Sequence, residues 1–554
     1  MSTRHLGCRR RNRPVCGPHW WSLDGRVKEG SPAGGGLGHD GSNRGGRPMT
    51  AKPDAAIDEV GVACEDDAFL QAQLEVVPRV FPLELPATPR AEVARRARQI
   101  GTVAGRHFAP IALKGAFTRR IAPDAWARPL RRTFEDLGAT FMKFGQLIGS
   151  APGIFGDGVA DEFRSCLDTG APVPFDEVRR AVEHDLGMPL DEAFWSFSES
   201  PIGRASISVV HKATTRDGRR VAVKVLRPGI ERRVATDLDL FQPLLEIVAK
   251  QTGEYAAGQL LAMFQGFREQ IGEELDLRNE ARAMAHYRWL LEQVNLTRVM
   301  VPEVFEDLSG PRVLTMEFLD GVPVDDLTTV AHYGYDPAPV VQEVIKGFLL
   351  TAIRWGTFHG DVHAGNLLLL PDGRVGVIDW GIVGRLDPET HQFFRLLIEA
   401  ALGDEAAWPD IARHAQRMYG PVLEQDLGMD HAQVEAFMRM AIEPVLTRPF
   451  GEVSLADLLT APQTKLAEIR GAEAEQLTMR AVYRRFRDQR RIRAAADAHG
   501  VYDSDLERSI FLLSKQLVYF ERYGRIFLRD VGLFEDEEFF RAALDAPTTA
   551  SRIS

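Results

Sequence analysis

Apolar residues recur at helical spacing over the first long patterned part of the chain. From Ala91 to about Trp195 this periodicity is typical of a mostly helical segment. Prolines interrupt it at Pro123, Pro152 and Pro172, where helices are expected to break. We therefore expect a helical extension over residues 91–195.

The pattern changes to β-branched runs from Phe197 onward. The stretch "ASISVVHKATTRDGRRVAVKVLRPGI" contains two such runs separated by Asp217-Gly218, a turn signal that predicts a β-hairpin. Helical periodicity resumes at about 231–295, and "VPEVFEDLSGPRVLTMEFLDG" suggests a pair of strands. Beyond about residue 337 the pattern is helical, apart from one further hairpin that follows a polar loop.

This order of elements predicts an α+β fold. We expect the helical extension to be followed by a small β-rich lobe at 196–320 and a large α-rich lobe at 321–480. Further helices are expected at 481–554, while residues 1–90 are expected to be disordered or non-native.

The first 48 residues are rich in Arg and Gly and show no periodicity, so they cannot build a core. They also lack the apolar region of a signal peptide. A more ordinary sequence opens at Met49. We hypothesise that translation starts there and that the Arg-Gly-Gly just upstream is a translated ribosome-binding site.

The composition of the 554 residues is that of an ordinary globular protein, with 45% hydrophobic and 26% charged residues. A formal net charge of -11 gives no general basic surface, so nucleic acid is not an expected partner. No apolar run approaches the roughly 18 residues that span a bilayer. The cysteines are far apart and lack C-x-x-C spacing, which favours a reducing cytoplasm over a zinc or disulfide framework. They are Cys8, Cys16, Cys64 and Cys166.

Two features near the C-terminus bear on packing and partners. The stretch "LERSIFLLSKQLVYFERYGRIFL" predicts an amphipathic helix that packs on the large lobe. Its apolar stripe consists of Leu506, Ile510, Leu513, Leu517 and Phe520. The basic run Arg480–Ala495 is either a solvated helix face or a loose, peripheral contact with an anionic membrane.

The segment His359–Asn366, "HGDVHAGN", allows two kinds of site. A zinc-binding pair of histidines four residues apart must lie on one helical turn, but the glycines and the β-branched valine here disfavour a helix. The following "LLLLPDGRVGVIDWG" has a Pro-Asp-Gly turn between two apolar runs and ends in Asp379-Trp380-Gly381. The pattern therefore predicts a loop, a hairpin and an acidic loop, or in the plainest case an ordinary polar loop.

That order is the arrangement used in phosphoryl transfer. Asp361 suits the residue that orients the phosphate acceptor, while Asn366 and Asp379 suit the pair that holds Mg²⁺ against the phosphates of ATP. The spacing of about five and then about thirteen residues is also that of a protein-kinase catalytic loop and its D-F-G segment.

Lys224 in "VAVKV" lies within a predicted strand, where a lysine needs a partner such as phosphate. About twenty residues upstream, small residues form a predicted turn whose backbone N–H groups could approach a nucleotide. The candidate nucleotide-binding residues in that turn are Gly203, Arg204, Ala205 and Ser206. Taken alone, a half-exposed strand lysine is an equally good reading of Lys224.

A kinase-type site also needs a glutamate to hold the strand lysine. The acidic helix predicted for "FREQIGEELDLRNEARAM" offers Glu269, Glu273 and Glu274, and the sequence does not choose among them. Most of these charges also suit a solvated face with weak Glu–Arg pairs.

The segment "LGATFMKFGQLIGS" belongs to the helical extension. On a helix it places Phe141, Phe144 and Ile148 on one side and Lys143 with Gln146 on the other. The polar pair either reaches a polar site or lies in water.

These motifs together resemble the ABC1 family of atypical kinases, also called AarF, UbiB or ADCK. Lys143-Phe-Gly-Gln146 resembles its K-x-G-Q motif, and Glu274-Leu-Asp276 resembles its E-x-D motif. The turn at 203–206 resembles its alanine-rich loop, and "FHGDVHAGN" with "IDWG" resembles its catalytic and D-F-G segments. Five ordered motifs over residues 130–390 carry the resemblance.

The resemblance implies a protein-kinase-like two-lobe fold in which the K-x-G-Q helix packs over the active site. It implies that Lys143 and Gln146 face the nucleotide, that Glu274 and Asp276 hold Lys143, and that ATP and Mg²⁺ are the cofactors. Family members are ATPases or unorthodox kinases tied to isoprenoid quinone and other lipid metabolism, so a lipid or quinone precursor is a candidate partner.

Some residues depart from the family pattern. Gly203 and Arg204 replace alanines of the loop, which puts the nucleotide preference in doubt, and Val362 and Ala364 replace prolines of the catalytic loop. The C-terminal membrane spans of many bacterial members are missing. Two alternatives are a small-molecule kinase of the aminoglycoside or choline type, which lacks K-x-G-Q and E-x-D, and a nucleotide-binding scaffold without turnover.

Overall fold

The structure is a computed structural model. It describes residues 85–118, 126–149, 157–163, 170, 172–251, 254–294, 296–420, 428–452 and 504–545. The expectations for Met49 and for the basic run Arg480–Ala495 lie outside these residues.

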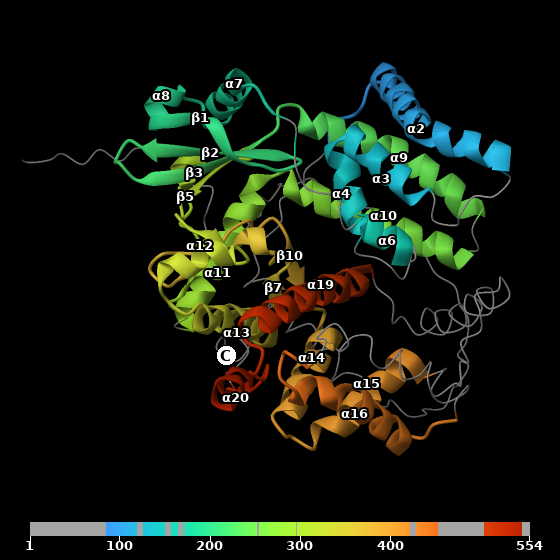
Figure 1. The fold of residues 1–554 in the computed structure, drawn as a ribbon, viewed down its shortest axis with the longest axis vertical. Helices are drawn as coiled ribbons and strands as arrows, with labels where there is room; N and C mark the ends of the chain where they lie inside the picture. The colour runs from blue at the N-terminus through green and yellow to red at the C-terminus, as the bar shows by residue number, and fades with distance from the viewer. Residues whose placement is uncertain are drawn as a thin grey trace, which may run out of the picture. The chain divides into compact units, whose positions relative to one another are not determined.

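The described part of the helical extension is joined to the following helices by an aromatic cluster. The cluster joins α3 (Ala127–Leu137), α4 (Ala139–Gly149), α6 (Asp157–Phe163), α9 (Ile230–Gln251) and α10 (Glu254–Glu274), and α2 (Arg90–Thr118) packs on α3 and α9. Ring centroids in the cluster lie 4.6 to 6.4 Å apart. Its members are Phe134, Phe141, Phe144, Phe163, Phe241, Phe264 and Phe267. This packing fixes α4 against α9 and α10 (Figure 1).

A four-stranded antiparallel sheet forms the core of the small lobe. Its strands, in spatial order, are β1 (Phe194–Arg204), β2 (Ser208–Thr215), β3 (Arg220–Leu226) and β5 (Val313–Glu317). Helices α7 (Phe175–Leu186) and α8 (Leu190–Ala193) cover the face that presents Val221, Val223 and Val225. Because side chains alternate along a strand, Lys224 lies on the opposite face.

The hairpin predicted at Asp217-Gly218 is confirmed, since β2 and β3 pair antiparallel and Gly218 has a φ of 89°. The predicted turn of small residues is partly wrong. Gly203 and Arg204 belong to β1, whose pairing with β2 continues to Arg204, so the turn itself lies at 205–207.

The single acidic helix predicted around "FREQIGEELDLRNEARAM" is also wrong. The structure has two helices there, α10, which ends at Glu274, and α11 (Leu277–Gln293). Asp276 has extended backbone angles and its side chain accepts a hydrogen bond from the Arg278 N–H. This N-cap starts a new helix, so Glu274 and Glu280 come from different helices.

The rest of the described chain builds the large lobe. Its elements are β4 (Val299–Met300), β6 (Val322–Pro323), α12 (Leu327–Tyr333), α13 (Ala338–Trp355), β7 (Thr357–His359), η2 (Ala364–Asn366), β8 (Leu367–Leu369), β9 (Val375–Val377), β10 (Val383–Arg385), α14 (Pro388–Ala401), α15 (Ala407–Gly420), α16 (His431–Thr447), α19 (Ser504–Phe527) and α20 (Glu537–Asp545). The short helical turn η1 (Glu306–Leu308) instead lies against the small-lobe sheet, where Leu308 packs on its core. Two short sheets have the orders β10-β7 and β4-β9-β8-β6.

The outcomes for the predicted strands in this part differ. The hairpin over the Pro-Asp-Gly turn is confirmed as β8 and β9, with Gly373 at a φ of 82°. The strand pair predicted in residues 301–321 reduces to β5 and one isolated bridge between Val304 and Met316. The short helical turn η1 occupies the intervening residues, which leaves no length for a second strand. The predicted α+β class itself is confirmed.

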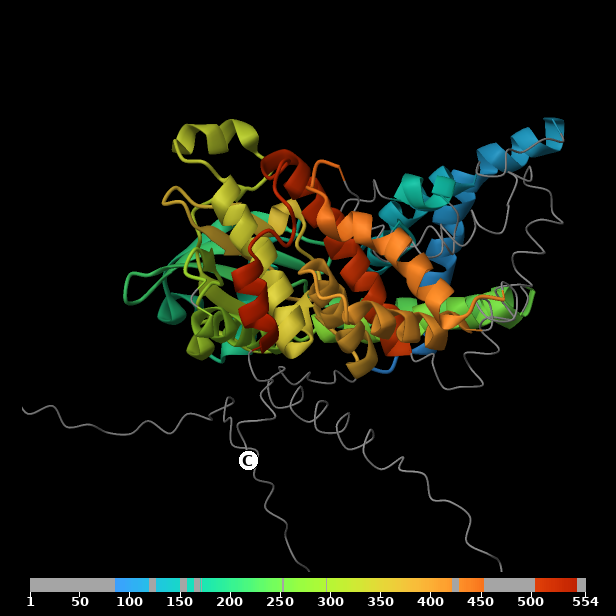
Figure 2. The ribbon, with the colours of Figure 1, turned by 90° about the horizontal axis from the view of Figure 1, so that it is seen from below.

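Helix α19 packs on the large lobe, as its apolar stripe predicted. Leu513, Leu517 and Phe520 are buried, and the helix contacts α10, α13 and β10. Both views draw α19 in red beside the yellow α13 (Figures 1 and 2). Among the described helices, none combines the length and the apolar character needed to cross a membrane.

A buried ion pair ties α2 to α9. The Arg96 Nε and Nη2 atoms donate to the two oxygens of Asp237 at 2.6 and 3.0 Å, and Nη2 also donates to the Leu137 carbonyl at 2.8 Å. The two side chains are only 7% and 0% exposed. Removing one partner of such a pair leaves an uncompensated buried charge.

We expect Arg96→Met to lower the free energy of unfolding by about 3 kcal/mol or more, because Asp237 then has no cation inside the protein. Urea denaturation measures the change. Arg95→Met is the matched control, since the Arg95 side chain is 77% exposed and should matter by less than about 0.5 kcal/mol. Equal stability of the two variants would contradict the assigned role.

Candidate active site

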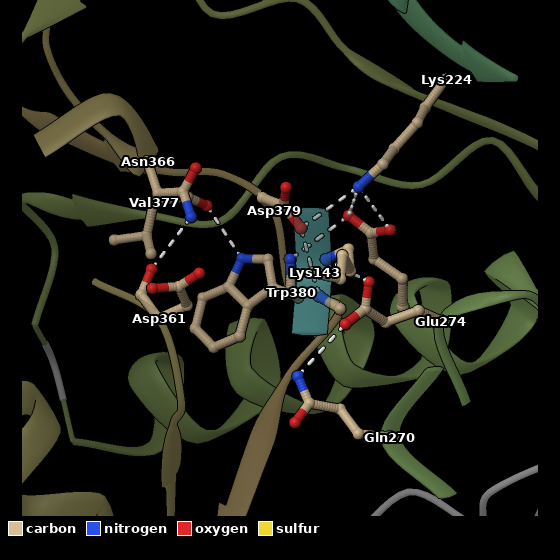
Figure 3. Close-up of polar contacts among 11 residues, drawn as sticks. Lys143, Lys224, Gln270, Glu274, Asp361, Asn366, Val377, Asp379 and Trp380 are labelled. Carbon is tan, nitrogen blue, oxygen red and sulfur yellow. Dashed lines mark hydrogen bonds and ion pairs between the residues drawn. The ribbon is translucent and has the colours of Figure 1, made fainter. Parts of the chain in front are cut away.

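Lys224 is the centre of a cluster that draws on three separate segments. Its ammonium lies 2.8 Å from both carboxylate oxygens of Glu280 on α11 and 3.1 Å from Asp379 Oδ1 in the loop after β9. Figure 3 shows Lys224 and Asp379 pointing toward one another. Lys224 and Glu280 are buried, whereas the Asp379 side chain keeps 46% of its surface exposed. Asp379 is therefore the carboxylate of the cluster that can meet a ligand.

The charged groups of the cluster shift one another's pKa values. Burial raises the pKa of Glu280 to about 6. The nearby Asp379 carboxylate also raises it, whereas the Lys224 ammonium lowers it. Burial by itself would also raise the pKa of Asp379, but the ammoniums of Lys224 and Lys143 hold it well below its usual range. The two carboxylates raise the pKa of Lys224 above its ordinary value, although burial opposes this. Glu280 is thus the acid that takes up a proton first.

The backbone at Asp379 is unusual. Its φ of 61° is the only positive φ at a non-glycine residue in the described part of the chain. Such a conformation costs energy and persists only where the surroundings enforce it. Here Trp380 N–H donates to Glu280 at 3.3 Å and Gly381 N–H approaches Asp379 Oδ1 at 3.4 Å. The turn points the Asp379 carboxylate back toward Lys224.

Three aromatic rings in contact couple this turn to its neighbours. The Trp380 indole lies 4.5 Å from the Tyr287 ring of α11 and 4.4 Å from the His359 ring at the end of β7, measured between centroids. The indole N–H donates to the Val377 carbonyl at 2.8 Å. Helix α11, the Asp379 turn and the polar loop after β7 therefore form one packed unit.

Asp361 lies on that polar loop, where a loop rather than a helix was predicted, and Asn366 lies in the short 3-10 turn η2 at its end. Asn366 Nδ2 donates to the Asp361 carbonyl at 2.9 Å, and the Asp361 N–H donates to His359 Nδ1 at 2.9 Å. The Asp361 side chain is half-buried. Figure 3 shows Asp361 and Asn366 to the left of the Trp380 indole and Asp379 above it.

These residues suit Mg²⁺ better than a metal that needs a full protein cage. No group of three or more His, Cys, Asp or Glu side chains with metal-binding geometry occurs in the described residues, and so the two histidines of the loop do not form such a group. The amide of Asn366 uses its nitrogen within the loop, which leaves its carbonyl oxygen for a ligand. That oxygen and the exposed carboxylate of Asp379 are hard donors, and Mg²⁺ takes one or two such ligands together with phosphate oxygens.

Helix α4 reaches the same region. Lys143 Nζ lies 2.5 Å from Glu274 Oε2, with side chains 16% and 7% exposed, and Gln270 donates to the other oxygen of Glu274 at 3.2 Å. Gln146 lies nearly one turn further along α4 and is half-buried. The polar face of α4 is thus not simply solvated. Asp276 is buried and accepts three hydrogen bonds from the Arg278 guanidinium, at 2.9, 3.2 and 2.5 Å.

The candidate nucleotide loop lies two strands from Lys224. Gly203 pairs with Val210 on β2, and Val210 pairs with Lys224 on β3, so these residues form one row across the sheet. Directly opposite residues share a face, and Gly203 therefore faces the same side as Lys224. Ala205 contacts Arg227, whose Nε and Nη2 donate to its carbonyl at 3.0 and 2.8 Å. Arg204 ends β1, and Ser206 is buried.

Glu280 was missed in the sequence, although it lies in the quoted acidic stretch. None of Glu269, Glu273 and Glu274 is the glutamate found on Lys224. Glu280 stands in line with Met284, Tyr287 and Leu291 on α11, and all of these are buried. An acid inside an apolar helical stripe is rare unless it is paired, and this signal distinguishes it from the others.

Comparisons with known proteins agree with this geometry. Residues 166–409 match the model of the ABC1 atypical kinase-like domain. An uncharacterized protein of Mycobacterium tuberculosis is 33% identical over 462 residues, which cover 82% of this chain and 83% of that protein. An uncharacterized aarF domain-containing protein kinase of Arabidopsis thaliana, chloroplastic, is 31% identical over 74% of this chain and 73% of its own.

A probable protein kinase UbiB of Marinobacter nauticus is 30% identical over 60% of each chain. Residues 166–409, which match the family model, contain Lys224, the polar loop and the Asp-Trp-Gly turn. The chain therefore belongs to the ABC1/AarF/UbiB family of atypical kinase-like proteins and has the α+β, kinase-like fold of that family.

Proposed function

We propose that this protein binds ATP with Mg²⁺ and transfers or hydrolyses the terminal phosphoryl group. The observation that supports this best is the Lys224 ammonium held between Glu280 and Asp379, next to a loop that presents Asp361 and Asn366. A lysine fixed in this way is a positioned cation for phosphate oxygens. This proposal requires that the protein turns over ATP. The alternative function is a scaffold that binds nucleotide without hydrolysing it.

The chain's own residues divide the work. Lys224 would contact phosphate oxygens, and Asp379 with Asn366 would hold the metal ion. Asp361 accepts the proton of the attacking hydroxyl or water as the new bond to the terminal phosphorus forms and the bond from that phosphorus to the departing ADP oxygen breaks. When bound, Mg²⁺ neutralises charge on the phosphates. Glu280 touches none of the reacting atoms and instead keeps Lys224 in place.

Helix α4 favours an ABC1-type activity over that of an aminoglycoside or choline kinase. Lys143 of α4 pairs with Glu274, and its charge is felt at Asp379. The small-molecule kinases lack this helix. We propose that α4 limits the size of the phosphoryl acceptor. The acceptor is a lipid or quinone precursor, or water.

A cytoplasmic location with peripheral membrane contact is part of the same proposal. The basic run Arg480–Ala495 would attract anionic lipid, with about 1 kcal/mol for each basic residue near the membrane surface. We expect vesicle binding that weakens with salt and is reduced by Arg490→Glu with Arg491→Glu. Sedimentation with anionic vesicles measures it, and neutral vesicles are the control. Binding that both substitutions leave unchanged would contradict this contact.

We expect ATP with Mg²⁺ to stabilise the wild type by about 2.7 kcal/mol at a hundredfold excess over the dissociation constant. Asp379→Asn and Lys224→Ala should weaken this effect, and Asp379→Asn should lower the hydrolysis rate by about 100-fold or more because charge at the phosphates is no longer balanced. Thermal unfolding and phosphate release measure the two effects. Asparagine also tolerates the positive φ at this position.

Asp372→Asn is the matched control, because Asp372 lies in the exposed turn of the β8–β9 hairpin and pairs with Arg374. It should leave binding and turnover unchanged. Hydrolysis that survives Asp379→Asn would exclude the proposed site, and nucleotide binding without hydrolysis in the wild type would favour the scaffold.

The raised pKa of Glu280 predicts an acid limb in the pH dependence of kcat/KM. Below about pH 6 Glu280 becomes protonated and holds Lys224 less firmly, so activity falls. For stability the sign is opposite. A raised folded-state pKa means that this group favours folding at low pH, and its contribution is lost as the pH rises through about 6. Glu280→Gln should remove the limb at pH 6 and lower activity at pH 8. An unchanged limb in that variant would assign it to another group.

A further inference from the structure

The peptide groups around Asp361 are hydrogen-bonded without exception. Gly360 N–H donates to the Ile382 carbonyl, Asp361 N–H to His359 Nδ1, and the Asp361 carbonyl accepts from Asn366. These bonds come from two residues of the site, His359 and Asn366, and from Ile382 just before β10. They account for three of the six backbone donors and acceptors between Gly360 and Val362.

The other three are satisfied by the distant helix α19. Gln516 Nε2 donates to the Gly360 carbonyl at 2.5 Å, and Gln516 Oε1 accepts from the Val362 N–H at 2.8 Å. Tyr523 OH donates to the Val362 carbonyl at 2.7 Å. One amide thus brackets Asp361 on both sides. The opposite orientation of that amide would set carbonyl against carbonyl and N–H against N–H, so the two partners fix it.

Burial makes these bonds consequential. Gln516 is 0% and Tyr523 is 1% exposed, and no water can replace a lost partner without repacking. The Tyr523 ring lies close enough to Asp361 for the carboxylate to help raise the pKa of Tyr523, after burial as the main cause. The next residue toward the N-terminus on the same face is Leu513, which is buried, while Phe520 packs on Phe348 at 4.7 Å. The helix is anchored independently of the two polar contacts.

We propose that Gln516 and Tyr523 are positioning residues that fix the backbone of the catalytic loop and so aim the carboxylate of Asp361 at the phosphate acceptor. This inference rests on the proposed function. Both side chains act through Asp361 and do not touch the nucleotide. They hold the loop from a helix that also contacts α10, which carries Glu274.

The two variants of Gln516 differ in what they remove. Gln516→Met keeps the length of the side chain and removes both hydrogen bonds. Gln516→Glu keeps the acceptor for Val362 N–H but places an oxygen against the Gly360 carbonyl. Tyr523→Phe removes only the hydroxyl and is the mildest change, so it remains informative if a Gln516 variant folds poorly.

We expect Gln516→Met and Gln516→Glu to lower kcat for ATP hydrolysis about 100-fold, because small displacements of a catalytic group cost about this much. Tyr523→Phe should lower kcat about tenfold. KM for ATP should change less than about threefold in all of them, because Lys224, Asn366 and Asp379 remain in place. Steady-state phosphate release measures both constants on the full chain.

Phe520→Leu is the control for a purely structural effect, since it loosens α19 without touching the loop. Val518→Ala is the surface control, as Val518 is 51% exposed. At equal loss of thermal stability, Phe520→Leu should retain kcat within about threefold. If kcat falls as far in Phe520→Leu as in Gln516→Met, the positioning role is wrong.

Hydrogen exchange of the peptide that contains Gly360–Val362 tests the same contact without any turnover. The Gln516 variants should exchange these amides about tenfold faster than the wild type, and the two control variants should not. Unchanged exchange overturns the proposal. A wild type without ATP hydrolysis, combined with faster exchange in the Gln516 variants, would reject the proposed function and leave the loop-holding role standing.

Discussion

The structure depends on one buried positive charge. The Lys224 ammonium has almost no contact with water, so it must be paired, and its partners lie 56 and 155 residues further along the chain. Satisfying that charge brings β3, α11 and the Asp-Trp-Gly turn together. The assembly of the site and the stability of the fold are therefore the same event, because a missing partner leaves a charge stranded in the interior.

The break between α10 and α11 allows a second lysine–glutamate pair to form near the Lys224 cluster. Because Asp276 starts a new helix, Glu274 and Glu280 each receive one lysine, Lys143 from α4 and Lys224 from β3. Asp379 lies in the field of both ammoniums. A change in the position of α4 would thus be felt at Asp379 through electrostatics alone, without any movement of the turn that carries it.

The sequence was informative where chemistry and local pattern coincide. The Pro-Asp-Gly hairpin, the loop that carries Asp361, and the strand position of Lys224 follow from turn residues and β-branched runs within a few positions. The same reasoning failed at Asp276, because an N-cap within an acidic, helix-forming stretch looks like one more helical residue.

Residues whose role depends on a distant partner could not be found in this way. Glu280 differs from Glu269, Glu273 and Glu274 only in its place within a buried stripe, which needs the correct start of α11. Gln516 lies on the buried face of a helix whose apolar pattern was correctly predicted, yet a lone glutamine says nothing about a loop some 150 residues earlier in the chain.

That separation has a consequence for synthesis on the ribosome. The loop around Asp361 is made 154 residues before Gln516, which at 5 to 20 residues per second is a delay of roughly 8 to 30 s. Once Asp379 has been added, the nascent chain contains Lys224, Glu280 and Asp379, but the Gly360 carbonyl and the Val362 N–H and carbonyl still lack their α19 partners. A polypeptide interrupted before α19 would keep the Lys224 cluster but would lack the side chains that hydrogen-bond the backbone on both sides of Asp361.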